Sequence, residues 1–97
     1  MKYQLGSITE DCAIVHISFD EILVPRSQLV LVDYDYIESA ASAKLTPLVK
    51  EMLERLLEIR GVDKLMVHER QLSVIKRETY SWENIIEGVH RTISSAT

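Results

Sequence analysis

Residues 46–76, TPLVKEMLERLLEIRGVDKLMVHERQLSVIK, carry the signals of a helix followed by a β-hairpin. Thr46 can cap the free backbone N–H groups at a helix start, and Pro47 suits the first helical position, where a backbone donor has no partner. Gly61 stands where a left-handed C-terminal cap is expected. The stretch therefore predicts a helix from Pro47 to Arg60.

The predicted helix is amphipathic, because its charged residues fall opposite an apolar face. Glu51 and Arg55 have the spacing of a favourable ion pair. The apolar face consists of Leu48, Val49, Met52, Leu53, Leu56 and Leu57. After Gly61, two alternating runs, Leu65–Glu69 and Leu72–Lys76, indicate a tight hairpin. Its buried face is expected to hold Leu65, Val67, Leu72 and Val74.

Elements on both sides of this stretch complete the core. The alternation over Ala13–Phe19 predicts a strand, and Gln28–Tyr34 predicts a second strand antiparallel to the first. Residues Asp35–Leu45 include small side chains and are interpreted as a linker or a poor helical turn rather than a core element. Ser81 is expected to cap a final helix. The apolar stripe of that helix consists of Trp82, Ile85, Ile86, Val89 and Ile93.

The resulting order, β-β-α-β-β-α, predicts an α+β fold. Its simplest closed core is an antiparallel sheet of about four strands with two helices on one face. A chain of 97 residues has the size of one domain, so residues 1–97 are expected to form a single unit. Five residues are expected in the core, where truncation should cost about 2 to 5 kcal/mol of stability. They are Leu56, Leu57, Val74, Trp82 and Ile86.

Composition limits the classes of partner. Eleven basic residues are scattered among fifteen acidic ones, for a net charge of -4, which argues against a nucleic-acid partner. The longest apolar run, Leu29 to Val32, is far too short to cross a bilayer, so no membrane partner is predicted. Cys12 is the only cysteine and cannot form an internal disulfide. A reducing, cytoplasmic location is therefore expected.

No catalytic, cofactor-binding or metal site is predicted, and the chain is not expected to be an enzyme. Cys12 and His16 would stand about 13 Å apart on the first predicted strand, too far to chelate one ion. His68 and His90 have no serine or cysteine nucleophile at a recognisable spacing and are expected at the surface or its boundary. The three glycines stand too far apart to form a phosphate-binding loop.

The most unusual local composition is the cluster of acids and tyrosines after the second predicted strand. Its members are Asp33, Tyr34, Asp35, Tyr36 and Glu38. An oxygen-ligand cation loop would bring glycine and more acids at fixed intervals, and these are missing. The acids are interpreted as a solvated strand end, and the tyrosines as a candidate contact surface.

Four segments together resemble the N-terminal domain of Nfu/NifU-type scaffold proteins. They are Thr46-Pro47-Leu48, the turn from Leu57 to Val62, the hairpin from Leu65 to Lys76, and Trp82-Glu83-Asn84-Ile85. In that family a Ser-Pro-Leu helix closes on an I-x-G-V turn, a hairpin follows, and a tryptophan near acids begins the last helix. The resemblance implies a stand-alone Nfu N-terminal-like domain, without the family's separate Cys-x-x-Cys domain.

The resemblance also implies a function, that of an accessory which helps to position scaffold against client. The leading hypothesis is a non-catalytic protein-interaction module for iron-sulfur cluster assembly or delivery, with an iron-sulfur scaffold, carrier or client protein as its partner. The hairpin and the exposed faces of the two helices are the expected contact surface. No cofactor is expected in the chain itself, because one cysteine cannot supply the four thiolates that a cluster ordinarily needs.

Two alternatives remain open. The first is a generic adaptor or homodimerising domain unrelated to iron-sulfur clusters, which pairs through exposed strand edges or the region from Tyr34 to Tyr36. The second is a small metal- or cluster-binding protein that uses Cys12 across a dimer.

Overall fold

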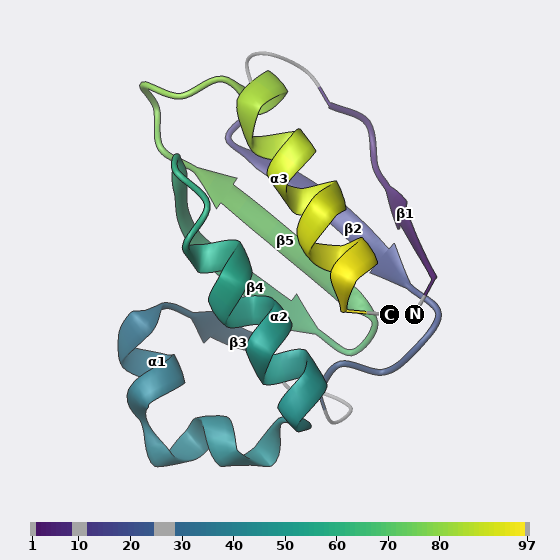
Figure 1. Ribbon diagram of the computed structural model, residues 1–97, viewed down its shortest axis with the longest axis vertical. Helices are drawn as coiled ribbons and strands as arrows, with labels where there is room; N and C mark the ends of the chain where they lie inside the picture. Colours follow the sequence, from purple (N-terminus) through teal and green to yellow (C-terminus); the bar gives the residue numbers. More distant parts are fainter. Residues whose placement is uncertain (1, 9–11, 25–28, 97) are drawn as a thin grey trace.

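The computed structural model describes residues 2–8, 12–24 and 29–96. In these ranges the chain forms β1 (Tyr3–Leu5), β2 (Ile14–Phe19), β3 (Leu29–Val32), α1 (Tyr34–Glu38), the 3-10 helix η1 (Ala40–Lys44), α2 (Pro47–Leu57), β4 (Val62–His68), β5 (Gln71–Lys76) and α3 (Trp82–Ser95). All strands pair antiparallel in one sheet of order β1-β2-β5-β4-β3. Helices α2 and α3 lie on the same face of that sheet (Figure 1). The predicted α+β fold is confirmed, with an additional strand and helix. No helix in the described ranges is long and apolar enough to span a bilayer.

Helix α2 begins where the sequence predicts. The Thr46 hydroxyl accepts a hydrogen bond of 3.2 Å from the backbone N–H of Val49, and Pro47 occupies the first turn. The helix ends at Leu57, three residues before the predicted Arg60. Its buried residues are Val49, Met52, Leu53, Leu56 and Leu57. Leu48, predicted on the same face, is 45% exposed, so that part of the prediction is wrong.

Helix α3 begins at the predicted cap, Ser81, whose hydroxyl accepts from the N–H of Glu83. The residues that it buries are Trp82, Ile85, Val89 and Ile93. Ile86, expected in the core, is only half-buried and packs against the core from its edge. The reason is helical geometry, because one residue beyond Ile85 the side chain points about 100° further round the helix.

The hairpin of β4 and β5 buries the four predicted residues. Leu65 pairs with Val74 and Val67 pairs with Leu72, and all four side chains are buried. The chain reverses at Glu69, whose φ of 52° is the left-handed value that tight hairpin turns require. These residues form the centre of a core that continues into β2 through Val15 and Ile17.

Two segments differ from the sequence prediction. Strand β3 runs antiparallel to β2 as predicted, but β5 and β4 separate them, and β3 pairs with β4. It is also shorter than the predicted Gln28–Tyr34, since Tyr34 begins α1; Gln28 lies outside the described residues. Of the interpretation of Asp35–Leu45 as a linker or a poor helical turn outside the core, the short helical turn is confirmed, and the placement outside the core is wrong. The segment forms α1 and η1, and its Ile37 and Leu45 are buried in the core.

Strand β1 has no counterpart among the predicted elements. It adds an edge to the sheet by pairing with β2, with Tyr3 opposite Phe19. The Tyr3 hydroxyl also shares a hydrogen bond of 2.6 Å with Nδ1 of His90 on α3, and the two ring centroids lie 5.7 Å apart. Strand β1 is therefore held both by the ladder and by a side-chain link to the helix layer.

We expect Tyr3→Phe to lower the free energy of unfolding by about 0.5–1 kcal/mol, because it removes one exposed hydrogen bond and keeps the ring. Urea denaturation followed by circular dichroism measures the loss. In a His90→Ala background the same substitution should cost close to nothing, since alanine offers no hydrogen-bond partner. Equal costs in both backgrounds would show that the hydrogen bond contributes no stability.

Candidate interaction surface

In each strand, every second residue points away from α2 and α3 and lies on the opposite face of the sheet. The alternation of buried and accessible residues identifies them along β1 to β4, and in β5 they are the residues that pair with open-face residues of β2 and β4. We call this surface the open face; it consists of Gln4, Ile14, His16, Ser18, Leu29, Leu31, Lys64, Met66, His68, Gln71, Ser73 and Ile75. It brings together strands that lie far apart in the sequence, as Figure 1 shows for β3, β4, β5 and β2.

Aliphatic side chains form a continuous stripe across the open face. Leu31 lies opposite Met66, and Ile14 lies opposite Ile75. Met66 and Ile75 are diagonal neighbours, because Met66 pairs with Ser73, two residues before Ile75. Leu29 extends the stripe at the edge strand, with 68% of its surface exposed, and Leu31 is 49% exposed. Isolated exposed aliphatics are ordinary, whereas a contiguous apolar patch is typical of a binding surface.

A hollow of about 310 Å³ lies beside the stripe. It is lined by His16, Leu29, Met66, His68, Gln71 and Ser73. At its base, Nδ1 of His16 shares a hydrogen bond of 2.7 Å with the hydroxyl of Ser73. Ser73 is only 6% exposed, so this cross-strand bond satisfies a buried hydroxyl. The hollow can accept an apolar side chain from a partner and offers the ring edges of two histidines as polar contacts.

The charge on the open face is positive, whereas the net charge of the whole chain is negative. Lys64 is its charged side chain, accompanied by His16 and His68, and none of its residues is Asp or Glu. The chain as a whole carries a net charge of -4. The nearest carboxylate along β4 belongs to Asp63, which lies at a bulge in the ladder and 3.9 Å from Arg77. The open face is therefore apolar and weakly basic on an acidic protein.

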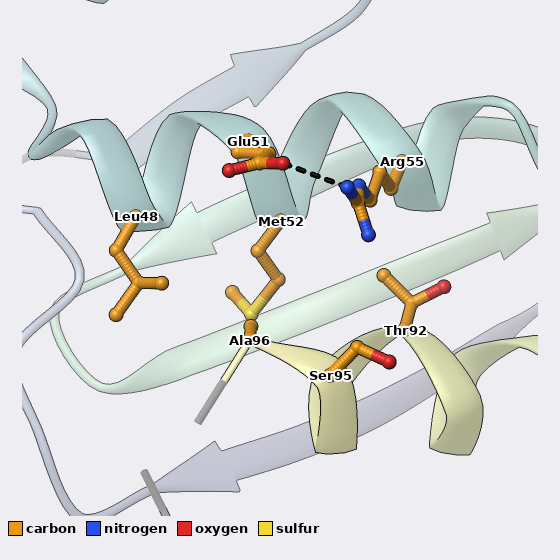
Figure 2. A pocket seen from close by; sticks show the side chains of 7 residues that line it. All are labelled: Leu48, Glu51, Met52, Arg55, Thr92, Ser95 and Ala96. Carbon is orange, nitrogen blue, oxygen red and sulfur yellow. Dashed lines mark hydrogen bonds and ion pairs between the residues drawn. The ribbon is translucent and has the colours of Figure 1, made fainter.

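The helix side of the molecule has a smaller hollow, of about 80 Å³, between α2 and the end of α3. Figure 2 shows Met52 pointing from α2 toward Ala96, with Leu48 beside it. The predicted ion pair between Glu51 and Arg55 forms at the rim, with a separation of 2.8 Å. This hollow can hold little more than a methyl group or a few water molecules, so it offers less to a partner than the hollow on the open face.

A third hollow, of about 380 Å³, lies at the turn after α2. Its lining is Ile59, Arg60, Tyr80 and Asn84. The hydroxyl of Tyr80 lies 3.4 Å from Nε of Arg60, and this contact raises the pKa of the guanidinium. Arg60 is charged at any ordinary pH, so the contact orients the side chain without creating a titrating group.

Cys12 and His16, the pair considered as metal ligands, have different hydrogen-bond partners. Cys12 is half-buried, and its thiol donates a hydrogen bond of 2.8 Å to the carbonyl of Ile14. His16 and His68 belong to the open face, and His90 is linked to Tyr3. Within the described ranges no group of three or more His, Cys, Asp or Glu residues could hold a metal ion.

The cluster of acids and tyrosines forms contacts within the chain. The Asp33 carboxylate caps α1 by accepting a hydrogen bond of 2.8 Å from the N–H of Tyr36. The Tyr34 hydroxyl donates to the carbonyl of Leu57 at the end of α2, at 3.1 Å. Tyr36 packs against the core. These residues therefore attach α1 to the body of the domain.

Fold and surface together define a small α+β domain with one face of its sheet open. No family model matches the chain, and no curated protein matches it in sequence. Protein SAV1430 from Staphylococcus aureus shares the fold, with a TM-score of 0.68 and 18% identity over 96% of this chain and 99% of that chain. A NifU-like protein from Saccharomyces cerevisiae shares it with a TM-score of 0.63 and 12% identity, over 97% of this chain and 76% of that chain. The chain therefore has a NifU-like fold.

Proposed function

We propose that this chain is a non-catalytic, cytoplasmic protein-interaction module that is accessory to iron-sulfur cluster assembly or delivery. One observation carries the interaction function, the aliphatic stripe on the open face, which includes Leu29 and Leu31. The link to iron-sulfur proteins is supported by the resemblance of the sequence to Nfu/NifU-type domains and by the NifU-like fold.

The stripe is large enough to matter energetically. Fully burying one leucine side chain contributes about 1.5–3 kcal/mol, and two leucines of the stripe are 68% and 49% exposed. Docking of a partner would recover this energy, offset by the cost of association. Cys12, by contrast, is engaged with the carbonyl of Ile14, which supports a role beside a cluster-carrying partner rather than as a cluster holder.

Anaerobic affinity capture tests the proposal. The tagged protein should enrich iron-sulfur scaffold, carrier or client proteins over a tag-only control, as identified by mass spectrometry. A Leu29→Gln, Leu31→Gln variant should lose most of that enrichment, because two amides cannot replace the apolar contact. Leu48→Gln is the matched control, since Leu48 is 45% exposed but lies on α2. Dominance of an unrelated partner would contradict the iron-sulfur role.

Homodimerisation is the second candidate function, and the edge strand β3 favours it. The strand presents two exposed leucines at the end of the sheet, where backbone groups can pair with another chain. Size-exclusion chromatography with light scattering should then give a dimer mass that the double Leu→Gln variant reduces to a monomer mass. A monomer mass for the unmodified protein at high concentration would remove this candidate.

A further inference from the structure

The side chains that border the aliphatic stripe indicate what kind of surface would complement it. Lys64 lies next to Ile75 in the ladder, and His16 and His68 flank Met66 on its other side. None of the outward positions of the five described strands is acidic. A partner surface that contributes carboxylates would pair with Lys64 and accept hydrogen bonds from the imidazoles, whereas a basic surface would leave Lys64 opposed by like charge.

The geometry of the stripe indicates the shape of the partner. Leu29, Met66 and Ile75 lie on one diagonal, which advances by one strand and two residues at each step. Two strand spacings and four residues along the strands give this diagonal a length of about 16 Å. An α-helix covers that distance in about three turns. A helix laid on the diagonal would cover the open face as α2 and α3 cover the other, and would complete a three-layer arrangement.

A second copy of this chain fits the charges less well. A symmetric dimer through the open face would place the same patch on both sides of the contact. Lys64 of each copy would then face a surface whose outward strand residues include no carboxylate. The lysine would lose water without gaining a partner, which is unfavourable.

We propose that the open face binds an amphipathic helix of a partner protein, with an apolar stripe bordered by Asp and Glu. Leu29, Met66 and Ile75 contact the apolar stripe, the hollow beside His16 receives one of its larger side chains, and Lys64 pairs with a carboxylate at its border. This inference rests on the proposed interaction function and does not depend on the partner being an iron-sulfur protein.

Two synthetic helical peptides of about four turns test the inference. One carries a Leu/Ile stripe bordered by Glu, and the other carries the same stripe bordered by Lys. Each is titrated into ¹⁵N-labelled protein and followed by NMR. We expect the Glu peptide to shift amide signals of β3, β4 and β5, and the Lys peptide to bind at least threefold more weakly, since exposed charge pairs contribute modestly.

Variants assign the contact. Lys64→Glu should lower the affinity for the Glu peptide about threefold to tenfold and raise the affinity for the Lys peptide. Leu29→Gln should lower the affinity for both peptides by about tenfold. Because Leu29 is 68% exposed, the substitution should leave the fold unaffected. Lys50→Glu is the matched charge control: Lys50 lies on α2, and its replacement should change neither affinity more than twofold.

Three outcomes would overturn the inference: no binding of either peptide, equal affinity for both, or shifts confined to α2 and α3. A concentration-dependent dimer that Leu29→Gln abolishes would also overturn it, in favour of a second copy.

Failure of the iron-sulfur proposal is distinguishable from all of these outcomes. Peptide binding at the open face, with no cluster protein captured from lysate, would retain the inference and remove the iron-sulfur role. If the Leu29→Gln variant still captures cluster proteins as well as the unmodified protein does, the iron-sulfur role would be retained and the inference removed.

Discussion

Replacing Trp82 with alanine is expected to lower the free energy of unfolding by about 3–5 kcal/mol. Trp82 is 2% exposed and is among the largest side chains in the core. Its indole Nε1 also donates a hydrogen bond to the backbone carbonyl of Cys12, 70 positions earlier in the chain. The side chain therefore joins the start of α3 to the residues that lead into β2. Urea denaturation followed by far-UV circular dichroism measures the loss without relying on tryptophan fluorescence.

Trp82→Phe separates the two contributions of this residue. Phenylalanine keeps most of the buried aromatic surface but cannot donate to the Cys12 carbonyl, so a smaller loss of about 1–2 kcal/mol is expected. A total stability of about 5–15 kcal/mol is usual for a domain of this kind, so the alanine variant should unfold at a much lower urea concentration. A loss below about 1 kcal/mol for Trp82→Ala would contradict its role as a core anchor.

The helices and the hairpin were predictable because local chemistry determines them. Thr46 and Pro47 specify where α2 begins, and the alternation around Glu69 specifies the reversal between β4 and β5. A cap was also present at Asp33, whose carboxylate starts α1. The small residues after Asp33 favoured an interpretation as a linker over one as a capped helix. A helix of five residues also has too few positions to show a helical period.

The candidate surface could not be predicted, because it depends on which strands are neighbours. The alternation in each strand identifies two sets of residues, but not the pairing of β3 with β4 or of β2 with β5. Only the first of these pairings brings Leu31 next to Met66, and only the second brings Ile14 next to Ile75. The strand β1 was missed for a related reason. Three residues are too few to show alternation, and its tie to His90 spans almost the whole chain.

Replacing Gly61 with alanine is expected to lower the free energy of unfolding by about 2–4 kcal/mol. Gly61 has a φ of +101°, a conformation that L-residues with a Cβ adopt only with strain. An alanine Cβ would also lie 2.9 Å from Cγ of Tyr80 and 3.0 Å from its Cβ. The strain and the clash add, because relief of either one by moving the backbone would disturb the hydrogen bond from the N–H of Arg77 to the Gly61 carbonyl.

Two further variants separate the strain from the clash. Tyr80→Ala removes the ring but keeps its Cβ, so Gly61→Ala in that background should cost less, about 1–2 kcal/mol, from φ and from the remaining contact with that Cβ. Gly88→Ala is the matched control within α3, where alanine favours the helix by about 1 kcal/mol and meets only the flexible side chain of Ile59 at 3.3 Å. Its net effect should therefore be close to zero. An undiminished cost of Gly61→Ala without the tyrosine ring would show that the ring contributes nothing to the requirement for glycine at the turn from α2 into β4.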